Sequence, residues 1–493
     1  MANGINSKAQ RILVVLLVII FGSGSWLTVS GVWCEIPILV ALGLPEKNRI
    51  TSYITLIVQT GLVWVFIFLC CNRYLASTRI YRLEIPVTYA VTFIGSIGSF
   101  LLIFFWNSKT YLSGEPHSVF FLFNVFLVSL VDMMMNTTSM GFISLLKPAY
   151  LNWLWIGIGM SSILPACVVL IQQAGATSTE TCVANYTFLN QTVVGNASVS
   201  YNCTSWREAA PEYLFTPSQF FTFLFVMMLC CHISFICLNY LPCARREYAP
   251  QPDGHHLKKD GCGGLFQWNS SDDPSSSEAD ELLSSRLNIL SDGLESANSD
   301  QSNSRELEGE LTNKQLVFLY SMCILNKYIL FGTLSPLQGF SASAYGRGTY
   351  GLVMPIHEIS DAFAFLLFLL KPIYSFKVVT GTFILGLISS LYCVIVAALS
   401  PYPPFSSLFF GKVLIVAAWI GAGLFHSYSR AATSWILRHT YESRKHLILS
   451  SALGEIGATV GAIIMFILIN VCNIFVAYED QGLCPTHPTC ILL

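Results

Sequence analysis

The first long apolar segment carries two indoles at a spacing that a helix turns into one surface. Trp26, Ser30, Trp33 and Pro37 lie at i, i+4, i+7 and i+11, which is one helical face. Two indoles beside a hydroxyl suit stacking on a flat heteroaromatic ligand. Glu35 points about half a turn from Trp33, so we predict a bend near Pro37, which cannot donate a helical hydrogen bond. The alternative is that Trp33 and Glu35 lie at the segment's outer edge, with Glu35 capping a break.

Three polar residues share one face of the fourth apolar segment. Asp132, Asn136 and Ser139 follow at i, i+4 and i+7. A carboxylate within an apolar segment is costly and faces a cavity or a partner. Ligand binding is one interpretation, and a structural hydrogen-bond knot between helices is the other.

A cluster of titratable residues follows Pro355 in the eighth segment. Asp361 lies four residues after His357 and three after Glu358. Coupled carboxylates and histidines titrate near neutrality, so the cluster is a candidate proton relay. We favour the simpler interpretation that this turn lines water.

Five further polar side chains stand in or beside apolar sequence. Lys327 and Arg430 are the basic groups placed to neutralise the intramembrane acids. Glu455 stands among glycines, a pattern that indicates close helix packing more than a site. Gln59 and Gln338 are neutral groups that suit a hydroxyl-rich ligand.

These residues must be positioned by membrane helices. The 493-residue chain is 54% hydrophobic and only 11% charged, with a mean hydropathy of +0.60, whereas soluble domains carry about 25% charged residues. About 20 apolar residues span a bilayer. The eleven candidate spans are Arg11–Leu42, Ile50–Cys71, Glu84–Trp106, His117–Leu146, Leu151–Gln173, Pro217–Tyr240, Asn313–Leu337, Gly348–Leu370, Phe376–Leu399, Phe409–Leu437 and His446–Tyr478.

The spans fall into six and then five. Residues 1–10 form a short N-terminus, 11–240 a six-helix bundle that includes the loop 174–216, and 313–478 a five-helix bundle followed by the tail 479–493. Residues 241–312 hold 14 of the 28 acidic residues, and a Ser- and acid-rich stretch with few aromatics is expected to be disordered. The fold class is therefore an all-α polytopic membrane protein.

Two patterns orient the spans. The sequons of the loop 174–216 begin at Asn185, Asn190, Asn196 and Asn202. Four in one polar segment indicate a glycosylated extracellular loop. The short segments that this orientation places inside hold Lys8, Arg11, Arg73, Arg79, Arg82, Lys147, Lys371, Lys377, Arg438, Arg444 and Lys445. Those outside hold Lys47, Arg49, Lys109, Arg347 and Lys412. The positive-inside rule thus agrees, with a cytoplasmic N-terminus and an extracellular C-terminus.

Four cysteines fall in the segments expected outside the cell, where disulfides persist. They are Cys182, Cys203, Cys484 and Cys490. We expect Cys182 to pair with Cys203 and Cys484 with Cys490, although sequence does not fix connectivity.

The sequence argues against several functional classes. It contains no nucleophile elbow, phosphate loop, metal motif or haem signature, which disfavours an enzyme and implies no cofactor. A net charge of -2 offers no basic surface for nucleic acid. The partners that it implies are the lipid bilayer and a small-molecule substrate, with no obligate protein partner.

The first span also carries a family resemblance. Its run Gly24-Ser-Trp26-x-Thr28-x-x-Gly31-x-Trp33-x-Glu35-x-Pro37 closely resembles the opening of the eukaryotic riboflavin transporter family, solute carrier family 52. Further matching stretches are Leu44-Pro45-Glu46, Phe105-Trp106-Asn107, Leu164-Pro165-Ala166, Ala344-Tyr345-Gly346, Val413–Ala417 and Gly461–Val471. The departures from the family pattern are Ser30, Leu62, Ile158, Asp361-Ala362, Tyr402 and Glu455.

The resemblance implies a sodium-independent, facilitative carrier for riboflavin in the plasma membrane. Its fold would be similar to equilibrative nucleoside transporters and the major facilitator group, with two bundles rocking about a central site. We expect the substrate-binding residues to be Trp26, Ser30, Trp33, Glu35, Gln59, Asp132, Asn136 and Gln338. A charge network would comprise Lys327, His357, Glu358, Asp361, Arg430 and Glu455. The alternatives are a carrier for nucleosides or another flat heterocycle and, less favoured, a glycosylated receptor.

Overall fold

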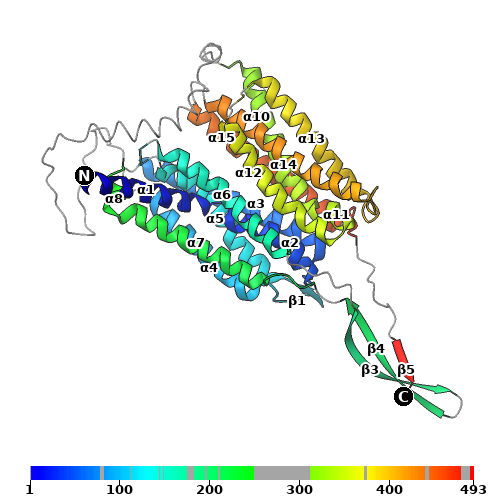
Figure 1. Cartoon of the computed structure of the whole chain (residues 1–493). Coiled ribbons are helices and arrows are strands. Elements are labelled where there is room, and N and C mark those ends of the chain that lie inside the picture. Colours follow the sequence, from blue (N-terminus) through cyan, green and yellow to red (C-terminus); the bar gives the residue numbers. More distant parts are fainter. Residues whose placement is uncertain are drawn as a thin grey trace.

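A computed structural model describes residues 2–77, 83–112, 114–143, 145–147, 149–174, 182–194, 197–208, 211–248, 311–370, 373, 375–438, 443–478 and 489–492. Within these ranges ten helices are long and apolar enough to cross a membrane, and the bent pair α1 and α2 brings the number to eleven when it is counted as one span. Six spans precede residues 249–310 and five follow them. The predicted polytopic helical architecture is confirmed, and Figure 1 shows the two groups of helices side by side.

The helices before residues 249–310 form the N-bundle. They are α1 (Ala2–Ser23), α2 (Leu27–Ala41), η1 (Lys47–Arg49), α3 (Ile50–Ser77), α4 (Glu84–Phe105), α5 (Val119–Ile143), α6 (Tyr150–Ala174), α7 (Pro217–Tyr240) and α8 (Pro242–Arg245). The remaining helices form the C-bundle. They are α10 (Asn313–Lys327), η4 (Tyr328–Leu334), α11 (Ser335–Ala342), η5 (Ser343–Tyr345), α12 (Arg347–Leu370), α13 (Phe376–Ala398), α14 (Phe409–Arg438), α15 (Ser443–Phe466) and η6 (Ile467–Val471). The last span was expected to reach Tyr478, but its helix ends at Val471.

The first span is broken, at a place different from the predicted one. Helix α1 ends at Ser23, α2 begins at Leu27, and their axes differ by 50°. Pro37 lies inside α2 without breaking it, so the predicted bend near Pro37 is wrong. The hydroxyls of Ser23 and Ser25 donate to backbone carbonyls one turn back, at 2.8 and 2.9 Å. Serine–glycine stretches of this kind compete with the helical ladder and kink helices.

Five strands lie outside the spans. β1 (Thr110–Leu112) and β2 (Glu115–His117) form a hairpin between α4 and α5. β3 (Cys182–Val194), β4 (Ala197–Glu208) and β5 (Thr489–Leu492) form an antiparallel sheet in the order β3-β4-β5. We call the membrane side at which α6 ends and α7 begins the strand face. The opposite side, at which α7 ends and α10 begins, is the loop face (Figure 1).

The apolar core joins the bundles toward the strand face. The largest cluster of buried side chains contains N-bundle residues together with C-bundle residues such as Leu334, Tyr345, Val353 and Trp419. A separate cluster toward the loop face is built from C-bundle residues, including Leu319, Phe368, Val379, Ala432 and Leu437. The two bundles therefore share a core on the strand side and hold distinct cores on the loop side.

Glycines bring α15 against the seventh span, as predicted for the residues around Glu455. A Cβ on Gly457 would lie 2.5 Å from the Ile324 carbonyl oxygen, and one on Gly461 would lie 2.9 Å from the Cα of Gly332. Such contacts exclude any larger residue. They fix the position of η4, a π-helical turn in the middle of the seventh span.

Candidate functional site

Trp26 stands at the interface between the bundles, where the broken first span turns. Its indole Nε1–H donates to Asn136 Oδ1 of α5 at 3.2 Å, which ties the ring to the N-bundle. The indole stacks on Phe331 of the C-bundle, with ring centroids 6.0 Å apart and planes inclined by 29°. The structure thus brings together two predicted site residues and adds Phe331, which the sequence analysis did not single out.

Ser30 lies one turn further along α2 and also reaches the C-bundle. Its hydroxyl donates to Glu358 Oε2 of α12 at 3.0 Å and lies 3.4 Å from the hydroxyl of Ser162 on α6. Ser30 and Glu358, predicted for different roles, are therefore direct partners across the interface.

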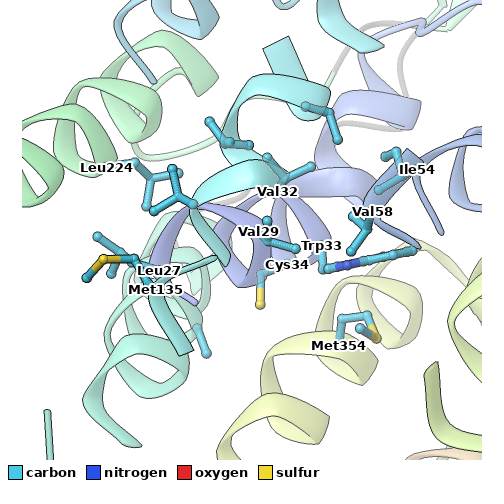
Figure 2. Close-up of a cluster of buried hydrophobic side chains, with 14 of the residues drawn as sticks. Leu27, Val29, Val32, Trp33, Cys34, Ile54, Val58, Met135, Leu224 and Met354 are labelled. Carbon is cyan, nitrogen blue, oxygen red and sulfur yellow. The ribbon is translucent and has the colours of Figure 1, made fainter. Parts of the chain in front are cut away.

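Trp33 and Glu35 make contacts different from those of the Trp26 ring. Figure 2 shows Trp33 among Ile54, Val58 and Met354, and only 8% of the indole residue is exposed. Trp33 therefore packs between α2, α3 and α12 as a core side chain.

The Glu35 carboxylate is held inside the N-bundle. It is fully buried, and its Oε1 accepts from Gln172 Nε2 of α6 at 3.1 Å. Nearby Tyr213 lies outside the spans. Burial, and secondarily the charge of Glu35, raise the pKa of Tyr213 to about 12. Glu35 is thus placed near the strand face, and the structure does not join it to the Trp26 surface.

Asp132 and Gln338 are buried polar side chains that lack partners. Both are 0% exposed, and no hydrogen bond is made by either carboxylate oxygen of Asp132 or by either amide atom of Gln338. The charged neighbours of Asp132 are Glu455, Lys327 and Glu358. Buried polar atoms without partners are uncommon in proteins. Both residues therefore have hydrogen-bonding capacity available to a ligand.

The remaining polar candidates occupy three separate sets of contacts. Gln59 Oε1 accepts from the Thr459 hydroxyl of α15 at 3.2 Å, which is a contact between the bundles. Lys327 forms an ion pair with Glu455 within the C-bundle. Arg430 lies over the rings of Phe331 and Phe365, with Cζ 5.1 and 5.5 Å from their centroids.

The predicted His357, Glu358 and Asp361 cluster is divided among different partners. His357 Nδ1 lies 3.0 Å from the Trp419 carbonyl oxygen, and Ser427 donates to the Asp361 carboxylate. Glu358 is bonded to α2, as described above. His357 and Asp361 therefore contact α14 at two different residues, while Glu358 contacts α2, and within the described part of the chain no hydrogen bond joins the three side chains to one another.

A set of polar contacts that the sequence analysis missed joins the bundles near the strand face. The Thr51 hydroxyl donates to the Pro336 carbonyl at 2.8 Å, and Asn470 Nδ2 donates to the Ser52 hydroxyl at 2.7 Å. Arg49 donates to Asn473 Oδ1 at 2.8 Å. With the Ser30 and Gln59 contacts, these bonds run from the middle of the spans to the strand face.

Other predictions fall on segments whose side chains lie outside the described part. Asn185, Asn190, Asn202, Cys182, Cys203 and Cys490 lie on β3, β4 or β5, where the backbone alone is placed, and Asn196 and Cys484 lie outside the described residues. The register sets Cys182 opposite Glu208, and Cys203 opposite Phe188 and Cys490. A disulfide needs Cα atoms within about 7 Å, so this register does not support the expected Cys182–Cys203 pairing. Among the described residues no group of three or more His, Cys, Asp or Glu could hold a metal ion.

Comparisons with known proteins bear on this arrangement. The family model described as solute carrier family 52, riboflavin transporter, matches residues 10–477. Member 3-B of that family from Danio rerio is 30% identical over 464 residues, covering 93% of this chain and 96% of its own. Member 3 from Homo sapiens is 28% identical and covers 96% of this chain and 99% of its own.

A solved structure shares the fold. A peptide transporter of the POT family superposes with a TM-score of 0.52 at 11% identity, covering 94% of this chain and 88% of that one. Family membership indicates a carrier rather than an enzyme. The resemblance noted in the first span is confirmed, and the chain belongs to solute carrier family 52, the riboflavin transporters.

Proposed function

We propose that this protein carries riboflavin across the plasma membrane into the cell by alternating access. The observation that carries the proposal, besides family membership, is the Trp26 indole at the bundle interface, with the partnerless Asp132 carboxylate one helical turn from Asn136, to which the indole is bonded. Riboflavin joins a flat isoalloxazine to a ribityl chain, and therefore needs an aromatic platform and hydrogen-bonding groups. It is neutral, which fits a site whose acids are offset by Lys327 and Arg430.

The site that we propose is centred on the interface residues. Trp26 stacks on the isoalloxazine, while Asp132, Asn136, Gln59 and Gln338 bind its edge and the ribityl hydroxyls. Ser30 borders the ligand and must exchange its bond to Glu358 when the bundles move apart. The contacts of Trp33 and Glu35 support a structural role, in which they hold α2 against its neighbours.

The charged residues fit a role in stabilising the two bundles as they move. The Lys327–Glu455 pair links α10 to α15, and Asp361 binds Ser427 of α14. Both contacts lie within the C-bundle and survive when the bundles separate. The Ser30–Glu358 bond crosses the interface, and it is the member of this set that a bundle movement breaks.

The orientation that we propose places the strand face outside the cell. Its support is the sequon cluster of the loop 174–216 and the excess of basic residues at the other face. The contacts that join the bundles near the strand face then close the outer side. With this orientation, these contacts support a carrier that is closed to the outside. A shift in electrophoretic mobility after glycosidase treatment of intact cells tests this orientation, and an unchanged mobility argues against it.

Labelled uptake tests the function. Cells that express the protein should accumulate riboflavin saturably above control cells, and lumiflavin should compete whereas uridine should not. Competition by uridine instead supports a nucleoside carrier. Surface binding without accumulation supports a receptor. The absence of saturable riboflavin uptake would refute the proposal.

A further inference from the structure

Four side chains form a continuous stack from one bundle to the other. Asn136 accepts from the Trp26 indole, the indole lies on Phe331, and the Arg430 guanidinium lies over the Phe331 ring. Asn136 and Trp26 belong to the N-bundle, whereas Phe331 and Arg430 belong to the C-bundle. The contact between the two rings is therefore one that any relative movement of the bundles changes.

The spacing of the Trp26 and Phe331 rings can be compared with the spacing that a flat ligand between them would need. Carbon atoms in contact lie about 3.5 Å apart, so a flat heterocycle between two rings requires roughly 7 Å between them. The Trp26 and Phe331 centroids are 6.0 Å apart. All four side chains of the stack are half-buried rather than sealed in the core. Because the two stacked rings are tilted by 29°, their centroid distance exceeds the gap between their planes, and a planar ligand enters only when the rings part by one ring thickness, roughly 3.5 Å.

The backbone and its neighbours fix the Phe331 ring in this position. Phe331 lies in the π-helical turn η4, and such turns occur frequently at functional sites. Arg430, which lies over the Phe331 ring, is also held over Phe365. A guanidinium over an aromatic face is an attractive contact. Arg430 thus acts as a positioning residue for Phe331.

We propose that Trp26 and Phe331 form an aromatic clamp that receives the isoalloxazine between its two rings. The proposal rests on the proposed riboflavin transport and names a binding residue of the C-bundle. In the ligand-free protein the rings close on each other, which keeps both faces covered. The clamp selects wide, flat heteroaromatic ligands, because a ligand must contact both rings to offset their separation.

The test compares Phe331→Leu with Phe365→Leu in cells expressing the full chain. Both phenylalanines contact Arg430, but among the described ring pairs only Phe331 stacks on Trp26. The readouts are KM for riboflavin uptake and the inhibition constant of lumiflavin, each normalised to surface protein. Loss of one stacking ring weakens the binding of a flat ligand, so Phe331→Leu should raise both constants about tenfold. Phe365→Leu removes a contact of Arg430 but no ring that stacks on Trp26, so it should raise both constants by much less than Phe331→Leu does. Phe331→Tyr should retain most of the affinity.

The outcomes separate the clamp from the transport function itself. Saturable wild-type uptake establishes the function independently of any variant. With that in place, equal constants for Phe331→Leu and Phe365→Leu overturn the clamp, and so does a lower KM in Phe331→Leu, which would mean that the ring competes with the ligand. Should Phe331→Leu fail to reach the surface, Phe331→Met replaces it. Purified wild-type protein should also quench riboflavin fluorescence, and Trp26→Leu should abolish that quenching.

Discussion

A methyl group at Gly339 should open the strand face. Gly339 lies on α11 of the C-bundle, and a Cβ there would lie 2.6 Å from Asn48 Oδ1 and 2.8 Å from both Cβ and Cγ of Asn48. Rotating the amide relieves only the first contact, because the other two atoms lie close to the Asn48 backbone. Asn48 belongs to the N-bundle and is 6% exposed. The clash therefore exists only while the bundles are closed on this side.

The size of the effect follows from the cost of overpacking. Extra methyl groups in packed interiors cost about 1–3 kcal/mol. If that cost falls on the closed state alone, the ratio of open to closed protein rises about 5- to 150-fold. Gly339→Ala should thus expose side chains at the closed interface. Gly348→Ala is the matched control, because a Cβ at Gly348 meets nothing within 4 Å.

Thiol labelling measures this opening. Ser52→Cys places a thiol where Ser52 is 0% exposed and bonded to Asn470 across the interface. In purified protein, peptide mapping should show labelling at position 52 at least fivefold faster with Gly339→Ala than with Gly348→Ala. Equal rates, or slower labelling with Gly339→Ala, would refute the reasoning that Asn48 and Gly339 close this face.

Two further predictions concern the ion pair and the cysteines. Lys327→Met should lower the free energy of unfolding by about 3 kcal/mol, because it removes the ion-pair partner of Glu455 within a membrane span, and adding Glu455→Met should recover at least half of that loss. If the double variant lost as much stability as the two single variants added together, the prediction would be contradicted. The register of β4 and β5 favours a Cys203–Cys490 disulfide, so non-reducing peptide mapping should find those two peptides joined. Finding Cys182 joined to Cys203 would favour the sequence-based pairing instead.

The membrane architecture could be predicted because it depends on composition. A span needs a run of apolar residues, and the runs near Glu84, Pro217 and Phe376 begin helices at those residues. The bend in the first span could not be placed in this way. Pro37 removes one hydrogen-bond donor from α2 but leaves the other helical hydrogen bonds intact. The glycines before Trp26 affect the bend through the close contacts that they permit with other helices, and a sequence does not show those contacts.

The site was predicted unevenly for a similar reason. Asp132, Asn136 and Gln338 could be singled out because a polar residue among apolar ones is conspicuous in sequence. Phe331 could not be singled out, because sequence alone does not distinguish a phenylalanine in an apolar span from its apolar neighbours. Only the fold shows that it lies opposite Trp26. The direction of Glu35 depended on the helix break, so placing the break wrongly also misplaced that carboxylate.

The close approach of α1 and α6 has a consequence for the interpretation of natural variants. A Cβ on Gly22 would lie 2.7 Å from the Leu154 carbonyl oxygen, and one on Gly157 would lie 2.3 Å from that of Ile19. Both obstacles are backbone atoms within one bundle, so they are present whichever side of the carrier is open. We therefore expect a change at either glycine to reduce the amount of protein that reaches the membrane, and the molecules that do arrive to keep their affinity. Reduced abundance rather than reduced activity is the defect to look for there.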